Sequence, residues 1–212
     1  MANVKRRLGR GSREQAKVTR ERILATAFTQ FGDDGYLPTT MESIAAAAGV
    51  AIQTVYYVFK TKSQLLREVV EFAGGGESDP VPVMQRAWMK EAFTTSDPHH
   101  AVALIVEHGV DIYARVAPLW PVLHTAASVD DQIAAYWQSV NDGRRQGMRG
   151  FAASLEERDA LRPGLTASRA ADILFVLDSH ETFLGFTRGA GWSLEEFKTW
   201  LFETLCSQLL PQ

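Results

Sequence analysis

Apolar side chains recur every three or four residues through most of this chain, which is the period of an amphipathic α-helix. The spacing predicts a first helix over residues 15–31, two short helices over 39–48 and 52–59, and a fourth that ends at the glycine run 74–76. Alternating apolar and polar residues nowhere continue long enough for a convincing β-strand. The pattern therefore predicts an all-α fold.

The glycine run, with Pro80 and Pro82 after it, is the clearest break in composition and predicts a domain boundary. The helical period resumes beyond it, and the total comes to about nine helices. The later ones are expected over residues 83–93, 98–116, 118–158 (in two parts), 166–188 and 194–210.

The first residues differ from the rest of the chain. Residues 1–14 show no apolar period and contain Lys5, Arg6, Arg7, Arg10 and Arg13. We expect a flexible basic arm there, which either reaches into a DNA minor groove or is a solvated tail. The expected division is thus an arm over 1–14, a domain over 15–73 and a second domain over 74–212.

Polar residues at the expected helix starts support these boundaries. A Ser or Thr followed three residues later by Glu or Gln predicts a capping box, in which each side chain hydrogen-bonds the other residue's backbone N–H. The chain has three such pairs and one Asp-Pro start: Thr39 with Glu42, Thr61 with Gln64, Ser193 with Glu196, and Asp97 before Pro98.

The segment 39–66 has the layout of a DNA-reading helix-turn-helix. Gly49 supplies the positive φ that ends a helix, and the next short helix has an apolar stripe of Ile52, Val55 and Phe59. Its outward side chains are Gln53, Thr54, Tyr56 and Tyr57. A Gln amide can pair with the edge of adenine, while hydroxyl groups and the ammonium of Lys62 suit phosphate oxygens.

These residues also carry a resemblance to a known family. The stretch AAAAGVAIQTVYYVFKTKSQLL resembles the signature of TetR-family transcription regulators, and the similarity extends from Val18 to Val69. A weaker resemblance covers AADILFVLDSHETF and RGAGWSLEEFKTWLFETLCSQLL, which are similar to the last two helices of many such regulators. The chain departs from the family pattern at Ala51, where Ser is usual, and at Gln53, where Gly is usual.

The resemblance implies an N-terminal three-helix DNA-binding domain and a C-terminal helical domain that binds a small-molecule effector and dimerises. It implies phosphate contacts at Thr40, Thr54, Tyr56 and Lys62, and base contacts at Gln53 and Tyr57. The implied function is transcription regulation, in which an effector releases a homodimeric repressor from a palindromic operator.

The C-terminal half is rich in large aromatic side chains, most of which we expect in the core. Polar groups inside its apolar helices need partners when buried, so they are either satisfied core groups or part of an effector cavity. The cavity residues expected are His124, Phe175, Asp178, His180 and Phe183. The last helices are apolar over a wide arc, which predicts a dimer interface at Phe186, Trp200, Leu201 and Leu205.

Charge divides the 212 residues unevenly. Residues 1–70 carry 11 Lys or Arg and 6 Asp or Glu, whereas residues 71–212 carry 11 and 19. A basic head on an acidic body suits a polyanion that binds at one end only.

Several protein classes are disfavoured. The single Cys206 permits no internal disulfide and no apolar run reaches 18 residues, so we expect a cytoplasmic protein without a membrane span. Phosphate-binding glycine motifs, a nucleophile elbow and metal-binding histidine spacing are absent, so we expect no enzyme, cofactor or metal. Two other interpretations stay open: a helical small-molecule-binding protein or enzyme with an incidental basic head, and an architectural DNA-binding protein without a ligand.

Overall fold

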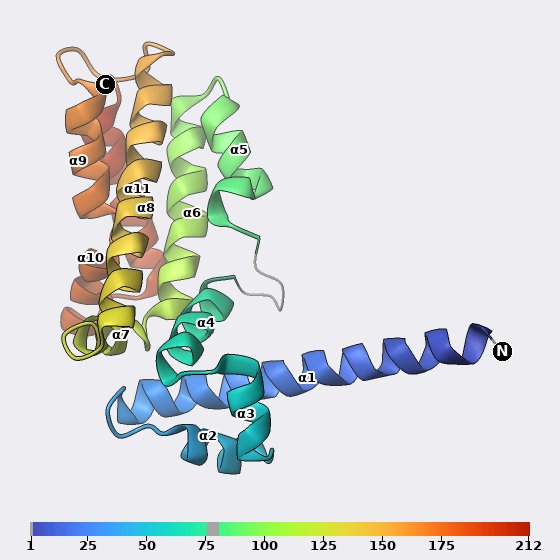
Figure 1. Ribbon diagram of the computed structural model, residues 1–212. Coiled ribbons are helices and arrows are strands. Elements are labelled where there is room, and N and C mark those ends of the chain that lie inside the picture. Colours follow the sequence, from blue (N-terminus) through green and yellow to red (C-terminus); the bar gives the residue numbers. More distant parts are fainter. Residues whose placement is uncertain (1, 76–80) are drawn as a thin grey trace. The chain divides into compact units, whose positions relative to one another are not determined.

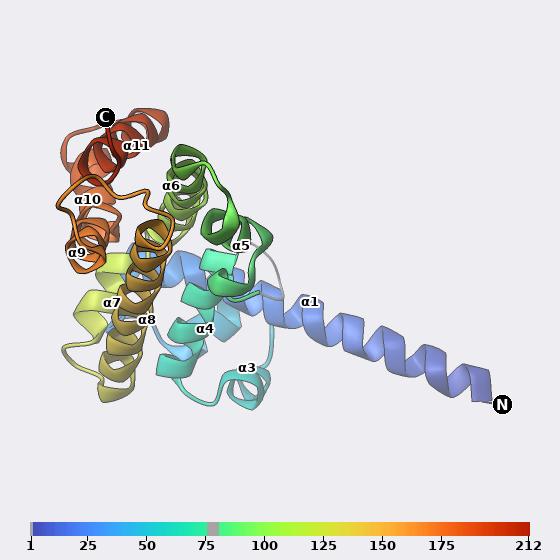
Figure 2. The ribbon, with the colours of Figure 1, turned by 90° about the horizontal axis from the view of Figure 1, so that it is seen from above.

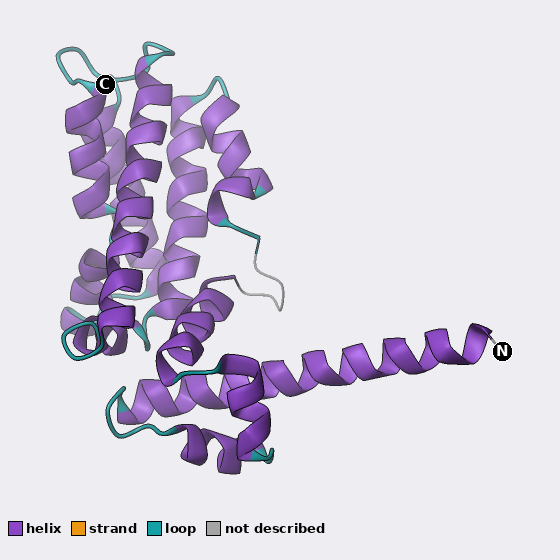
Figure 3. Ribbon diagram, viewed as in Figure 1, coloured by secondary structure: helices purple, strands orange, loops and turns teal. Residues whose placement is uncertain are grey.

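The computed structural model describes residues 2–75 and 81–212, with side chains from Arg13 onward. All regular structure in these residues is helical (Figure 3), which confirms the all-α fold. The chain divides into two compact units. The first comprises Met1–Ala73 and Pro118–Tyr136, and the second comprises Gly74–Ala117 and Trp137–Gln212.

The first unit is built from the N-terminal helices and one later segment. Its helices are α1 (Ala2–Asp34), α2 (Met41–Ala48), α3 (Ile52–Phe59), α4 (Lys62–Gly75), α7 (Trp120–Ala126) and the beginning of α8 (Asp131–Glu156). Helix α2 packs on α1 and on α3, and α1 runs far beyond them toward the N-terminus (Figures 1 and 2).

The helical period predicted the core of this unit. Side chains spaced three and four apart on α1, α3 and α4 are completely buried: Ile23, Leu24, Ala27, Phe31, Val55, Phe59, Leu65, Leu66 and Val69. The short helices α3 and α4 would be marginal alone, so the shared apolar core supplies most of their stability.

Helix α1 begins earlier than expected. Its helical backbone starts at Ala2, whereas a flexible arm over residues 1–14 was expected. The segment contains no proline, and its Ala, Arg, Lys and Leu residues are good helix formers, so Gly9 and Gly11 do not stop the helix. The side chains of residues 1–12 lie outside the described part.

One predicted cap is displaced by a residue. The hydroxyl of Thr40, not of Thr39, accepts the first hydrogen bond of α2, from Ser43 N at 3.0 Å, and Ser43 Oγ accepts from Thr40 N. Thr39 is instead buried and donates to Gly35 O at 2.7 Å. The sequence offered two adjacent threonines, and the tight exit loop after α1 decided which of them could act as the cap.

The other predicted helix starts are correct. Asp97 caps the helix that follows it, and Ser193 with Glu196 forms a complete capping box. Thr61 accepts from Gln64 N at 3.0 Å, although the Gln64 amide turns to Glu68 and leaves this box half formed.

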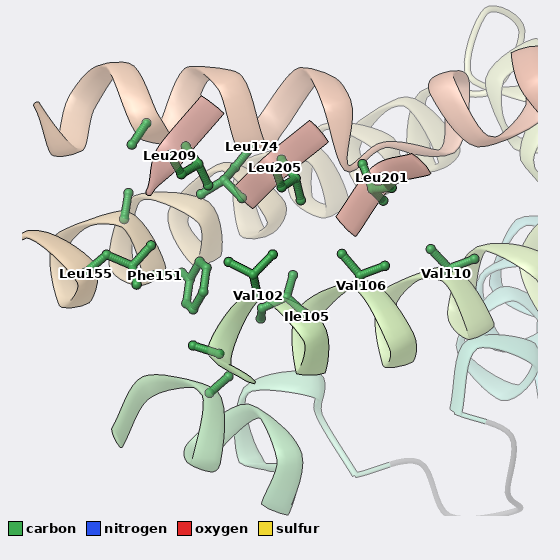
Figure 4. Close-up of a cluster of buried hydrophobic side chains, with 14 of the residues drawn as sticks. Val102, Ile105, Val106, Val110, Phe151, Leu155, Leu174, Leu201, Leu205 and Leu209 are labelled. Carbon is green, nitrogen blue, oxygen red and sulfur yellow. The ribbon is translucent and has the colours of Figure 1, made fainter. Parts of the chain in front are cut away.

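The second unit is a bundle. It contains η1 (Val83–Gln85), α5 (Ala87–Thr94), α6 (Pro98–Val116), the remainder of α8, α9 (Ala167–Leu177), α10 (His180–Leu184), the π-helical turn η2 (Gly185–Gly189) and α11 (Leu194–Leu209). Helices α6, α8, α9 and α11 run alongside one another (Figure 1). Their facing side chains meet in a core of branched aliphatic residues (Figure 4), among them Val102, Val106, Leu155, Leu174, Leu201 and Leu205.

One helix was expected in two parts and another is interrupted unexpectedly, which is why the helices of the described residues are numbered to α11 rather than to nine. The segment 118–158 is divided into α7 and α8, and the segment expected as one helix over 166–188 breaks at Asp178 and Ser179. Ser179 has an extended backbone and caps α10 by accepting from Thr182 N at 3.1 Å. Apolar spacing continues across this break, so periodicity could not reveal it.

The segment 118–136 groups with the first unit, whereas it was expected in the C-terminal domain. Leu119 and Leu123 are buried. The Tyr36 hydroxyl donates to Asp130 Oδ2 at 2.6 Å, and Ser63 Oγ donates to Gln132 Oε1 at 2.9 Å. These polar contacts join residues far apart in sequence, which a reading along the chain cannot detect.

Candidate DNA-binding and effector sites

Helices α2 and α3 form a helix-turn-helix. Gly49 has φ 63°, the left-handed conformation that suits glycine, and the Val50 N–H closes the turn on Ala45 O at 3.0 Å. The chain bends by 116° between the two helices, within the usual range for this motif. No single helix in the described ranges is long and apolar enough to cross a membrane.

Helix α3 separates its buried and exposed faces cleanly. Val55 and Phe59 are buried, whereas Gln53 is exposed and Tyr57 is 78% exposed. Tyr56 is exposed too, but its hydroxyl donates to Glu42 Oε1 at 3.3 Å and so ties α3 to α2. The structure therefore brings Gln53 and Tyr57 to a free surface, as a base-reading role requires.

The two threonines expected at phosphates differ in exposure. Thr40 is exposed at the start of α2, where the first backbone N–H groups of the helix also point outward. Thr54 is half-buried on α3. The cap expected to be missing at Ala51 is missing, because this residue has no side-chain hydrogen bond to the helix it precedes.

Lys62 has an internal role that the sequence did not reveal. Its Nζ donates to the backbone carbonyl groups of Tyr36 and Thr39 at 2.9 and 3.0 Å and lies 4.2 Å from the centre of the Tyr36 ring. Burial lowers the pKa of this ammonium, and the nearby Asp130 carboxylate partly offsets that effect. Lys62 thus fixes the loop that leads into α2, and its expected phosphate contact stays a prediction.

Lys60 is a candidate that the sequence reasoning missed. It follows α3 directly, is exposed, and has a φ of 57°. Its Nζ donates to Tyr57 O at 2.7 Å and lies 5.0 Å from the centre of the Tyr57 ring. Lys60 could have been singled out from the sequence, because it directly follows the predicted helix 52–59 and lies three residues after Tyr57.

In the second unit, buried polar groups gather where α9 ends. Asp178 is 1% exposed, and His180 and Tyr113 are also buried. The Tyr113 hydroxyl donates to the backbone carbonyl of Asp178 at 2.8 Å, and Arg144 Nη2 donates to the same carbonyl at 2.9 Å. We call Tyr113, Arg144, Asp178 and His180 the polar cluster.

The polar cluster shifts the ionisation of its members. Burial raises the pKa of the Asp178 carboxyl to about 6, although Tyr113 and Arg144 favour its charged form. Burial, with a smaller contribution from the Arg144 charge, holds the pKa of His180 well below its usual value, so the imidazole is neutral. At neutral pH the cluster therefore holds one guanidinium and one carboxylate.

The expected effector residues come together only in part. Phe183 is buried, with its ring centre 6.2 Å from that of Tyr113, and so it joins Asp178 and His180. Phe175 is half-buried and lies under the guanidinium groups of Arg144 and Arg145. His124 is exposed on α7 in the other unit, and its assignment to the cavity stays a prediction.

The expected dimer residues also divide. Leu201 and Leu205 are completely buried in the core of their own unit and have no surface to offer a partner, so this part of the expectation is wrong. Phe186 and Trp200 are half-buried, with ring centres 4.3 Å apart, and Trp192 joins them. A hollow of about 400 Å³ lies elsewhere in this unit, beside Arg162, Ser207 and Gln212.

No group of three His, Cys, Asp or Glu side chains in the described part of the chain is arranged to hold a metal ion.

Sequence comparison matches the N-terminal helices to a known family. Residues 23–69 match the family described as "Bacterial regulatory proteins, tetR family". The chain is 36% identical over 66 residues to the HTH-type transcriptional regulator AcrR of Shigella flexneri, a match that covers 31% of each chain. The matched segment thus spans less than a third of this curated relative.

Solved structures with similar folds cover nearly the whole chain. NalD, described as the secondary repressor of the MexAB-OprM multidrug efflux pump in Pseudomonas aeruginosa, superposes with a TM-score of 0.71 at 22% identity, over 94% of this chain and 99% of that one. The SmeT–triclosan complex superposes with a TM-score of 0.69 at 22% identity, over 92% and 93%; SmeT is the repressor of a Stenotrophomonas maltophilia efflux pump. The helix-turn-helix segment therefore matches the TetR family of bacterial regulatory proteins, and the whole chain shares its fold with the NalD and SmeT repressors.

Proposed function

We propose that this protein is a cytoplasmic transcriptional repressor that binds a palindromic operator as a homodimer and leaves it when a small molecule binds the second unit. The observation that carries the DNA-binding part is the division of α3. Val55 and Phe59 fix the helix to its unit, while Gln53 and the 78% exposed Tyr57 face outward with no internal task. A helix presented in this way can enter a major groove.

The contacts on DNA follow from the chemistry of the exposed groups. The Gln53 amide reads an adenine edge, and Tyr57 contacts a neighbouring base or its sugar. Thr40 and the N–H groups at the start of α2 bind one phosphate, and Lys60 binds another after turning away from the Tyr57 ring. Phosphate contacts position the helix, whereas the base contacts select the sequence.

The dimer is supported by apolar surface on α9 and α11. Val176 on α9 is 62% exposed, and Trp200, Phe202 and Cys206 on α11 are only partly covered. A two-fold dimer that covers this surface would present two copies of α3 and so match two operator half-sites. Val176→Glu should leave the fold intact and give a monomer in sedimentation velocity, and a monomeric wild-type protein at micromolar concentration would contradict the proposal.

The effector part is supported by the polar cluster and by the fold. Asp178, His180 and Phe183 are buried together in the second unit, which is how polar and aromatic groups line ligand cavities. SmeT, with the same fold, was solved with triclosan. Repression and release require that the effector favour the non-binding state, and DNA must then weaken effector binding by the same factor.

The DNA-binding proposal is tested by selecting duplexes from a random pool with the purified protein. We expect a palindromic consensus whose affinity falls steeply with salt. Gln53→Ala should weaken binding by about 1–3 kcal/mol and relax one base position in each half-site. A pool that shows no enriched sequence, or a consensus unchanged by Gln53→Ala, would contradict the assignment.

A further inference from the structure

The helix break at Asp178 is held by side chains from two other helices of the second unit and by Ser179 within the break itself. A break frees backbone carbonyl groups, and buried carbonyl groups need donors. Arg144 Nη2 donates to Phe175 O and Asp178 O, the Tyr113 hydroxyl also donates to Asp178 O, and Ser179 Oγ donates to Val176 O at 2.9 Å. These hydrogen bonds stabilise the break. The break places the carboxyl group of Asp178 in the interior of the unit.

That carboxyl group is left incompletely bonded. Asp178 is 1% exposed, and its Oδ1 has no hydrogen-bond partner. It faces Gly109 on α6, where an added Cβ would lie 3.6 Å from Oδ1. Arg144 Nε is likewise buried without a partner, although the same guanidinium donates to two carbonyl groups through Nη2. An unbonded buried acceptor and donor both cost stability, so their joint presence calls for an explanation.

The surroundings restrict what could bond to these two atoms. A cationic ligand would be attracted by Asp178 but repelled by Arg144, and the reverse holds for an anion. A neutral hydroxyl group fits both, because it donates one hydrogen bond and accepts others. The nearby rings are those of Tyr113, His180 and Phe183, with the first two 4.3 Å apart between centres. Such rings favour an aromatic ligand body.

We propose that Asp178 Oδ1 and Arg144 Nε are the polar end of the effector site, and that the effector is a neutral aromatic alcohol or phenol whose hydroxyl donates to Oδ1 and accepts from Nε. The inference rests on the proposed effector function and makes it specific. It assigns the polar contact to Asp178 rather than to His180, whose ring instead lines the site beside Tyr113.

The test compares four probes that share one ring system: 2-naphthylmethanol, 2-methylnaphthalene, 2-naphthoate and 2-naphthylmethylammonium. Equilibrium dialysis against the full-length protein without DNA should show the alcohol binding at least about tenfold tighter than the other three, because only it satisfies both groups. Asp178→Leu should remove the preference for the alcohol over the hydrocarbon. Asp178→Asn, which keeps an acceptor at Oδ1, should retain part of it.

Asp172→Leu is the matched control, since Asp172 is an exposed carboxylate on α9, the helix that ends just before Asp178, and its replacement should change no probe affinity. The proposal is overturned if no probe binds at 1 mM, if the ammonium or the carboxylate binds best, or if Asp178→Leu keeps the wild-type preference. The first two outcomes need only wild-type protein, so they decide the matter should Asp178→Leu fail to fold. Alcohol binding that depends on Asp178 but leaves operator affinity unchanged would instead uphold the site and refute release by the effector.

Discussion

The two units use their polar side chains in opposite ways. In the first unit the helix-turn-helix keeps a continuous apolar core, and Gln53 and Tyr57 stand in solvent. In the second unit the bundle interrupts a helix so that Asp178 and its neighbours are taken out of solvent. Both units are built from amphipathic helices. In the first unit the functional side chains lie on the exposed face of a helix, whereas in the second they lie at a buried helix end.

The difference follows from the size of the expected partner. DNA supplies a large charged surface with many contacts, so the protein can leave its reading groups hydrated until the complex forms. A small molecule offers few contacts, and a site discriminates among small molecules only when its polar groups are desolvated beforehand and suffer from a wrong match. Exposed polar side chains therefore cost little folding free energy, whereas the cost of burying polar side chains has to be offset by the surrounding apolar core.

The largest expected effect separates the two faces of α3. Phe59→Ala removes a completely buried ring and should destabilise the first unit by about 3–5 kcal/mol, and operator binding should disappear with the fold. Tyr57→Ala should leave the urea midpoint unchanged while operator affinity falls. Circular dichroism in urea and fluorescence anisotropy with labelled operator measure the two quantities. Equal loss of stability in both variants would mean that α3 has no free face.

The next effect tests the cost of the buried carboxyl. The folded-state pKa of Asp178, about 6, lies above the value of 3.8 expected when unfolded, so the folded protein binds this proton more tightly. The penalty is full above pH 6, shrinks as the pH falls through the folded pKa, and is absent below about pH 4. Asp178→Asn should thus gain roughly 3 kcal/mol in stability, relative to wild type, on going from pH 4 to pH 7.

Urea unfolding at both pH values measures this difference between variants, which cancels the titration of the other carboxylates. Asp172→Asn, on the exposed face of α9, is the control and should show no such pH dependence. Tyr113, Arg144 and His180 lie around Asp178; burial raises the pKa of Tyr113 and lowers that of His180, and both residues are present in wild type and variant alike. A stability difference that stays constant with pH would show that Asp178 titrates normally.

The sequence predicts the first unit's exposed helix face better than the second unit's buried polar cluster. Exposed and buried faces of α3 follow from spacing alone, and Val55, Phe59, Gln53 and Tyr57 all lie where the period predicts. The helix caps were also predicted from the sequence, except that Thr40 rather than the neighbouring Thr39 caps α2. Local rules suffice wherever the deciding contacts are a few residues apart.

The sequence failed where distant residues decide. The break at Asp178 depends on Tyr113 and Arg144, which lie on two other helices. Lys62 is bound by carbonyl groups more than twenty residues earlier, at Tyr36 and Thr39. None of these hydrogen bonds can be seen in the spacing of apolar residues, because each joins a side chain to a backbone carbonyl group.

A smaller effect distinguishes the two lysines beside α3. Lys62→Met should lower stability by about 1–3 kcal/mol, because two buried carbonyl groups lose their donor, while the salt dependence of operator binding stays the same. Lys60→Met should leave stability unchanged and reduce the slope of log affinity against log salt by about one unit. Anisotropy titrations at four salt concentrations measure the slopes. If Lys62→Met alone reduced the slope, Lys62 would leave its carbonyl groups to bind phosphate.

The smallest expected effect is a gain, at the one cap that α3 lacks. Ala51 has the extended backbone of an N-cap, with φ −66° and ψ 141°, but no side-chain oxygen to accept from the helix. Ala51→Ser should place a hydroxyl near the N–H of Thr54 and stabilise the first unit by about 0.5–1 kcal/mol. Ala47→Ser, at an exposed position inside α2, is the matched control and should cost a few tenths of a kcal/mol, since serine is a poorer helix former than alanine. Urea unfolding of both variants measures the two changes in stability.

Operator affinity gives a second result. A gain in stability at residue 51 without any change in operator affinity would show that Val55 and Phe59 already hold the reading face of α3 in place. A gain in affinity as well would mean that fraying of α3 limits binding in the natural sequence.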